Sequence, residues 1–181
     1  MAKTVIKFGL SVREIDRAIK ELEQYKQELI RKIDLLREKV AQRIASLAQS
    51  GFSGAIVDDL LPESGGARQA EVTVSLDQRD NVTVVVAQGE DAIWVEFGAG
   101  VYHNKGYLGS SPNPFNAEND LGFTIGGFGT NGDKEVWGFY EDPNDKKSLR
   151  LTHGTPAVMP MYNAVQTVCD EIVDIAREVF Q

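Results

Sequence analysis

The sequence is poor in cysteine and has no long apolar run. Its single cysteine, Cys169, cannot form a disulfide within the chain or a zinc site built on thiolates, and one thiol is compatible with a reducing compartment. No stretch of about 18 apolar residues is present, which argues against a membrane-spanning helix. The first residues lack the apolar run and cleavage site of a signal peptide. We therefore expect a protein made in the cytosol that does not enter a membrane.

Positive charge is scarce outside the first fifty residues. Residues 1–50 hold 11 Lys and Arg against 7 Asp and Glu, whereas residues 51–181 hold 8 against 20. The acidic part repels phosphates, which disfavours stable sequence-specific binding of DNA. Two arrangements fit the asymmetry. Either the basic part of one subunit lies on the acidic surface of another, or its charges pair within the chain or stay solvated.

A long helix is predicted near the start of the chain, whose 181 residues correspond to one domain of ordinary size. Ser11 and Glu14 have the spacing of a capping box, and no glycine or proline follows until after Gln49. Such a helix would be about 55 Å long, which is more than a domain of this size covers. Part of it is therefore expected to project or to pack on another chain.

A seven-residue repeat runs along this helix. One position of the repeat holds Ile15, Leu22, Leu29, Leu36 and Arg43, and the other holds Ile19, Lys26, Ile33, Val40 and Leu47. This seam favours contact between copies of the chain, or a helix that folds back or lies across the sheet with solvated ends. Lys26 interrupts the seam, either to set its register or because its ammonium reaches water.

Three strands of an antiparallel meander are predicted after the helix. Gly51 to Gly54 are expected to end the helix through a left-handed glycine, residues 55–61 to form a helical turn, and Pro62 to Gly66 to connect onward. Apolar and polar residues then alternate over 71–76, over 81–87 and from Ile93 to Phe97. The glycines of Gly98-Ala99-Gly100 would let the backbone leave the sheet there.

A long insertion follows at residues 101–133. It is rich in glycine, asparagine and serine, and it carries the aromatic residues Tyr102, Tyr107, Phe115, Phe123 and Phe128. Aromatic side chains supply much of the buried area at interfaces, so the segment either orders on a partner or forms a flap on its own domain.

The remainder predicts two more strands and a C-terminal helix. The strands are expected over 135–140 and 149–152, and the helix should start with Thr155 as N-cap and Pro156 in its first turn. One apolar stripe at helical spacing should cover the sheet: Val158, Met161, Tyr162, Val165, Val168, Ile172, Ile175 and Val179. The predicted fold class is α+β, with a helix over 1–50 and an α+β domain over 51–181 that contains the insertion.

Candidate catalytic residues are few. His103 and His153 lie beside loops, where they could converge with Glu96 or Asp133, but neither has a metal-binding spacing. The glycines of residues 126–129 lack the lysine and the strand context of a phosphate-binding loop. We therefore expect no catalytic, metal or cofactor site. The alternative from another class is a metal-dependent hydrolase that uses His103, His153 and Glu96.

Two stretches carry a resemblance to a known family. Residues 95–100, VEFGAG, and residues 153–164, HGTPAVMPMYNA, are similar to motifs of the tail-completion and head–tail joining proteins of long-tailed phages and prophages. In that family a V-E-F-G segment is followed, after a variable insertion, by a P-A-x-P element that opens the last helix. Aromatic residues often precede the second motif, as Trp137 and Tyr140 do here. The chain departs from the family at Ala99, where a small hydroxyl residue is frequent, and in its long insertion.

The resemblance implies a structural virion protein without enzymatic activity. It implies a homo-oligomeric ring, sixfold in the simplest expectation, at the neck or tail of the particle, assembled in the host cytoplasm. The implied neighbours are tail-tube, terminator and head-connector proteins, and DNA would only pass through the lumen. A tail terminator or a minor capsid component is the structural alternative. Expected interface residues are Ile15, Leu22, Leu29, Leu36, Glu96, Phe97, Gly98, Tyr102, Tyr107, Phe115, Phe123 and Phe128.

Overall fold

The computed structural model describes residues 9, 11–98, 136–155 and 157–181. The predicted fold class is confirmed: a long N-terminal helix, small antiparallel sheets and a C-terminal helix packed against them. The helices are α1 (Val12–Ser53), α2 (Ala92–Phe97) and α4 (Pro160–Phe180), with two 3₁₀ turns, η1 (Pro62–Ser64) and η3 (Lys146–Ser148). The strands are β1 (Ile56–Val57), β2 (Arg68–Gln69), β3 (Thr73–Arg79), β4 (Val82–Gln88), β5 (Trp137–Tyr140) and β6 (Leu149–Thr152).

Helix α1 begins where the sequence predicts. Ser11 is the N-cap, and its side-chain oxygen accepts a hydrogen bond from the Glu14 N–H at 3.4 Å. The Ser11 hydroxyl donates to the Glu14 carboxylate, so the reciprocal bond of the capping box comes from the hydroxyl, not from the backbone. With 42 residues the helix is about 63 Å long.

The end of α1 differs from the prediction. Gly51 lies inside the helix, which continues through Ser53. Gly54 is the C-cap, but its φ of −98° is right-handed, so the expected left-handed glycine is wrong. Gly51 is needed for close packing, because a Cβ at this position would lie 2.8 Å from the Pro160 Cβ. The glycine lets α1 and the first turn of α4 approach each other.

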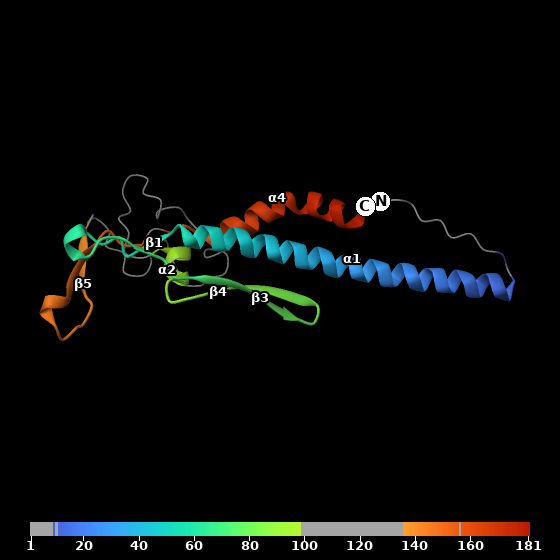
Figure 1. The fold of residues 1–181 in the computed structure, drawn as a ribbon, viewed down its shortest axis with the longest axis horizontal. Helices are drawn as coiled ribbons and strands as arrows, with labels where there is room; N and C mark the ends of the chain where they lie inside the picture. The colour runs from blue at the N-terminus through green and yellow to red at the C-terminus, as the bar shows by residue number, and fades with distance from the viewer. Residues whose placement is uncertain (1–8, 10, 99–135, 156) are drawn as a thin grey trace.

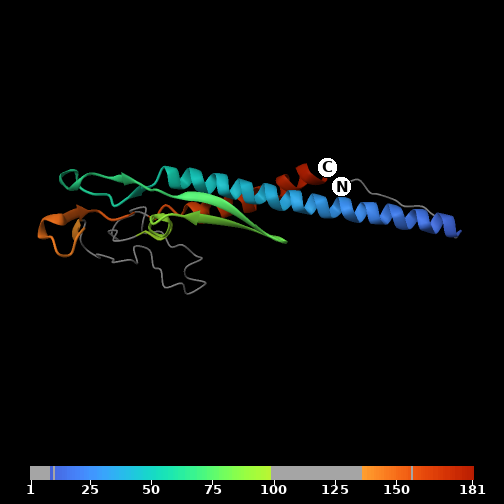
Figure 2. The same ribbon diagram turned by 60° about the horizontal axis from the view of Figure 1, so that its bottom comes forward.

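The molecule is elongated and built around α1. Helix α4 runs along one side of α1, and the β3–β4 hairpin lies along the other (Figure 1). Helix α4 is antiparallel to α1, since its first turn lies at Gly51 and its last carbonyl, that of Gln181, accepts from Lys32 Nζ at 3.5 Å. Met161 in the first turn of α4 also packs against the core cluster that contains Val57 of β1. The second view shows α1 continuing past both neighbours (Figure 2).

Two of the three predicted meander strands are confirmed. β3 and β4 pair antiparallel, with Val74 opposite Ala87 and Leu76 opposite Val85. The third predicted strand is wrong, because residues 92–97 form helix α2. Its buried positions, Val95 and Glu96, lie three and four residues after the half-buried Ala92, which is helical spacing. A short apolar run fits both the two-residue period of a strand and the 3.6-residue period of a helix, and residues 92–97 adopt the helix.

The C-terminal strands pair with each other. β5 and β6 form a two-stranded antiparallel sheet, as the patterns at 135–140 and 149–152 suggested. The predicted helical turn over 55–61 is wrong: Ile56 points outward and Val57 is buried in the short strand β1, which pairs with β2. The predicted start of the last helix is also wrong. The Thr155 hydroxyl accepts from the Asp58 N–H at 3.1 Å and does not cap α4, which starts at Pro160.

One small core joins these elements. It contains Phe52, Ala55, Val57, Val72 and Val95, with Met161 packed against it. Because Phe52 belongs to α1, the helix shares its core with the rest of the domain.

The Gln49 side chain of α1 forms hydrogen bonds with the backbone at the start of β3. Its side-chain oxygen accepts from the Val74 N–H at 2.8 Å, and its amide group donates to the Val72 carbonyl at 3.0 Å. The side chain thereby pairs one backbone group in β3 and one in the residue directly before it.

Candidate interaction surface on the long helix

The N-terminal half of α1 extends past the other described helices and strands, although Ala18 within it is buried. We call residues 12–31 the arm, because α4 reaches only to Lys32 (Figure 1). Every residue from 21 to 30 is exposed. The large apolar side chains exposed on the arm and at its base are Val12, Ile15, Ile19, Leu22, Tyr25, Leu29, Ile30 and Ile33.

These apolar residues form the stripe that the heptad pattern predicts. Leu22 is 54% exposed and Ile33 is 50% exposed, whereas Leu36, Val40 and Leu47, further along the same seam, are half-buried. The seam is therefore covered by the domain from Leu36 onward and open before it. A contiguous apolar stripe on a soluble helix marks a surface for binding another protein.

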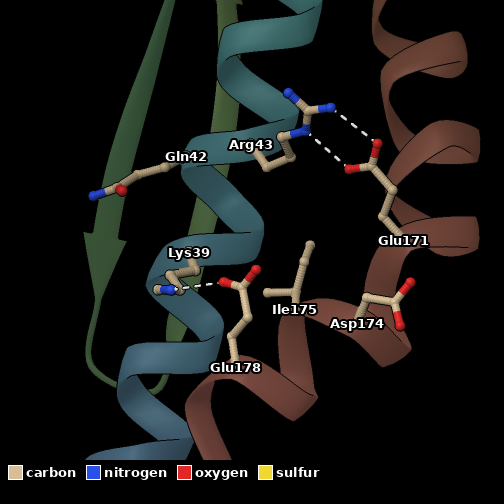
Figure 3. Close-up of a pocket in the computed structure, with 7 residues that line it drawn as sticks. All are labelled: Lys39, Gln42, Arg43, Glu171, Asp174, Ile175 and Glu178. Carbon is tan, nitrogen blue, oxygen red and sulfur yellow. Dashed lines mark hydrogen bonds and ion pairs between the residues drawn. The ribbon is translucent and has the colours of Figure 1, made fainter.

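The covered part of α1 is held to α4 by ion pairs. Arg43 makes two hydrogen bonds of 2.9 Å to the Glu171 carboxylate, and Lys39 Nζ lies 3.1 Å from Glu178 (Figure 3). The Arg43 guanidinium lowers the pKa of Glu171. Several cations of the basic segment thus pair within the chain, which is one of the two arrangements that the charge asymmetry allowed.

A groove of about 600 Å³ lies along this polar edge between α1 and α4 (Figure 3). Lys39, Gln42 and Arg43 line it from α1, and Glu171, Asp174, Ile175 and Glu178 line it from α4. The lining of the groove contains no histidine, serine or cysteine. Four of its charged groups pair across the two helices, Lys39 with Glu178 and Arg43 with Glu171, and Asp174 pairs with Arg177 within α4.

Glu96 caps helix α4 although it lies 65 residues before Met161 in the sequence. Its carboxylate oxygens accept hydrogen bonds from the backbone N–H groups of Met161 at 2.9 Å and Tyr162 at 3.1 Å. Helix α4 needs this acceptor, because its own N-cap, Met159, offers no side-chain bond. Glu96 is 8% exposed, and this burial raises its pKa, although the two N–H groups offset part of the rise.

The two motifs of the family resemblance meet at this cap. The Val95 carbonyl accepts from the N–H groups of Val158 at 2.9 Å and Met159 at 3.3 Å. Gly98 has a φ of 74°, and a Cβ there would lie 3.0 Å from the Ala157 nitrogen. We call this contact between residues 95–98 and 155–162 the motif junction. Of the residues expected at an interface, Glu96 and Gly98 are buried in it within the chain, and Phe97 is half-buried.

A second buried carboxylate fixes the start of α2. Asp91 accepts two hydrogen bonds from Arg68, at 2.8 and 2.9 Å, and one from the Glu71 N–H at 2.9 Å. The Arg68 guanidinium lowers the pKa of Asp91 despite its burial. The alternation of apolar and polar residues on either side of Asp91 did not reveal this pair. No local signal in the sequence points to it, because the Asp91 carboxylate does not cap α2 and its partners lie 20 and 23 residues earlier.

The described residues bring together no metal-binding group. Among them no cluster of three or more His, Cys, Asp and Glu side chains could hold a metal ion. His153 is half-buried, and its backbone N–H donates to the Asp59 carbonyl at 2.9 Å. His103 and Asp133, along with the glycines at 126–129, lie outside the described residues. Within the described part of the chain, no helix is long and apolar enough to span a membrane.

The remaining expected interface residues are not placed. Tyr102, Tyr107, Phe115, Phe123 and Phe128 all lie outside the described residues, so their role stays a prediction. Comparison with models of protein families, with curated proteins and with solved structures gives no match for this chain. The features that bear on function are therefore the arm, the motif junction and the charge distribution.

Proposed function

We propose that this chain is a non-enzymatic structural protein of a phage particle. In this proposal it assembles as a ring at the neck, where it completes the tail and joins it to the head connector. The observation that carries the proposal is the arm. None of the other described helices and strands covers Leu22 or Leu29 of this stripe, and a subunit of an assembly needs such an exposed apolar surface.

The motif junction supports the same proposal. The two stretches that resemble tail-completion proteins are separated by more than fifty residues, yet they form one packed unit through Glu96 and Gly98. Conserving this unit would keep α4 in place while the segment between the motifs varies. That is the behaviour expected of a family in which a variable insertion separates two recognisable motifs.

The charge distribution fits a passage for DNA. Residues 51–181 hold 20 Asp and Glu against 8 Lys and Arg, so most of the chain repels phosphates. A ring with an acidic lumen would let DNA pass without retaining it, because few phosphate contacts could form. A ring whose channel is lined by Lys and Arg would contradict this part of the proposal.

Electron microscopy of the purified chain tests the proposal. We expect closed rings with a central channel, formed either by the chain alone or after addition of tail-tube subunits, and seated at the end of the tubes. The matched control is the Leu22→Asp, Leu29→Asp variant, which we expect to remain unassembled. Absence of rings under both conditions would contradict a neck role. In whole particles, a label found on the capsid wall and absent from the neck would indicate a minor capsid component instead.

A further inference from the structure

The arm has the repeat of a two-stranded coiled coil. In the heptad notation abcdefg, its stripe places Val12, Ile19, Lys26 and Ile33 at a, and Ile15, Leu22 and Leu29 at d. The apolar a positions are all β-branched, and two of the three d positions are leucine. In a parallel coil, this combination favours two strands over higher-order assemblies.

Two further exposed residues select the parallel orientation. Tyr25 and Ile30 are each 49% exposed and lie outside the a and d seam, at positions g and e. In a parallel pair, a g residue contacts the e residue that lies five positions later on the partner helix. Tyr25 of one copy would therefore cover Ile30 of the other, and the symmetry of the pair repeats the contact. In an antiparallel pair, g residues face g residues and e residues face e residues, so Tyr25 and Ile30 would not contact each other.

Lys26 fits the same arrangement. It is exposed at an a position between Leu22 and Leu29, and none of the ion pairs among the described residues includes it. A single lysine at a sets the register of a coiled coil and favours a low oligomer number, at a cost in stability. Its long stem can pack on the seam while the ammonium reaches water.

The structure also shows where such a coil would end. Lys32 Nζ donates to the Gln181 carbonyl at the end of α4, and from Leu36 onward the seam is half-buried by the domain itself. The open length runs from Val12 to Ile33, which is about three heptads. Three to four heptads is the length at which such a repeat becomes a usable coiled-coil signal.

We propose that the arms of two copies of this chain wind around each other as a parallel two-stranded coiled coil, with Lys26 setting the register. The partner is a second copy because the arm supplies both halves of the Tyr25 and Ile30 contact. This inference concerns the arm alone and does not depend on a virion role. A dimer could exist without any ring, so this inference can hold where the ring proposal fails.

Disulfide trapping of the full chain tests the orientation. In a Cys169→Ser background, Leu22→Cys places a thiol at d, and Gln24→Cys places one at the outward f position as a matched control. Both residues are exposed, so neither change removes a core contact. A parallel pair predicts that mild oxidation links Leu22→Cys, and not Gln24→Cys, into a species of twice 19.9 kDa.

Several outcomes would overturn the proposal. These are no cross-link with either variant, equal cross-linking of both, or a cross-link that forms only when Leu22→Cys is mixed with Ile19→Cys or Lys26→Cys protein. The last result would indicate antiparallel arms.

Lys26→Ile supplies a second measurement. It should tighten dimerisation at least about tenfold, with Lys20→Ile at the outward b position as control. Equal effects of the two changes would contradict the role given to Lys26.

Discussion

The carboxylate of Glu96 accepts a hydrogen bond of 2.9 Å from the backbone N–H of Met161, 65 residues later in the chain. This bond joins α2 to the first turn of α4 and brings together the two motifs that suggested a function. The bond supplies an acceptor for a backbone N–H in the first turn of α4.

Removing the Glu96 acceptor should destabilise the domain. Glu96→Ala leaves the N–H groups of Met161 and Tyr162 without their buried acceptor, so we expect a loss of about 2–4 kcal/mol in the free energy of unfolding. Urea denaturation followed by circular dichroism measures this loss. The control is Glu178→Ala, which removes only an exposed ion pair and should cost less than about 1 kcal/mol. Equal effects would show that Glu96 does not cap α4.

Glu96→Gln isolates the effect of the buried charge. Burial raises the pKa of the Glu96 carboxyl group above its ordinary value of 4.5. The carboxyl group therefore binds its proton more tightly in the native protein than in the unfolded chain. Its contribution to stability is full below the unfolded pKa and is lost as the pH rises through the folded pKa. The stability advantage of wild type over Glu96→Gln should therefore be largest below about pH 4.5 and shrink as the pH rises through the raised folded pKa. An advantage that grows as the pH rises would contradict the raised pKa.

The opposite pH dependence is expected for Asp91. Its pKa is lowered by Arg68, so its contribution is present above the unfolded pKa and is lost as the pH falls through the lowered folded value. Asp91→Asn should cost about 1.5–3 kcal/mol near neutral pH and less in acid. Asp77→Asn, in an exposed pair with Arg79, is the matched control and should change stability by less than about 1 kcal/mol. Denaturation of both variants across pH provides the comparison.

Gly51 should resist replacement although it lies in a helix. Alanine is normally the better helix former by about 1 kcal/mol, but a Cβ here would lie 2.8 Å from the Pro160 Cβ. We expect Gly51→Ala to lower the free energy of unfolding by about 1–3 kcal/mol through overpacking. At Gly54 a Cβ would have no heavy atom within 4 Å, so Gly54→Ala should be close to neutral. A stabilised Gly51→Ala protein would show that the helices separate easily here.

The sequence predicted those parts of the fold that depend on local signals. Helix α1 follows from Ser11 and from the absence of glycine and proline before Gly51, and β3 and β4 follow from alternation. The segment 92–97 could not be assigned this way, because six residues satisfy a strand and a helix equally well. Its helical state brings Glu96 to the N–H groups of Met161 and Tyr162, which are distant in sequence.

The candidate surface was predictable in part for the same reason. The heptad seam is a local pattern, and it identified Ile15, Leu22 and Leu29. Which part of the seam stays open depends on where α4 ends against Lys32, and that is a tertiary fact. Thr155 illustrates the limit. Threonine is a preferred N-cap residue, but the Thr155 hydroxyl accepts its hydrogen bond from the Asp58 N–H instead.

Sedimentation velocity of wild type and of the Leu22→Asp, Leu29→Asp variant tests most directly whether the arm joins one copy of the chain to another. At about 10 µM the wild type should sediment as a dimer or a larger assembly, and the variant as a single chain of 19.9 kDa. The unfolding temperature of the variant's domain should stay unchanged, and Gln24→Asp, Gln27→Asp should behave as wild type. Single chains for wild type as well, or a variant whose whole domain unfolds, would contradict the account.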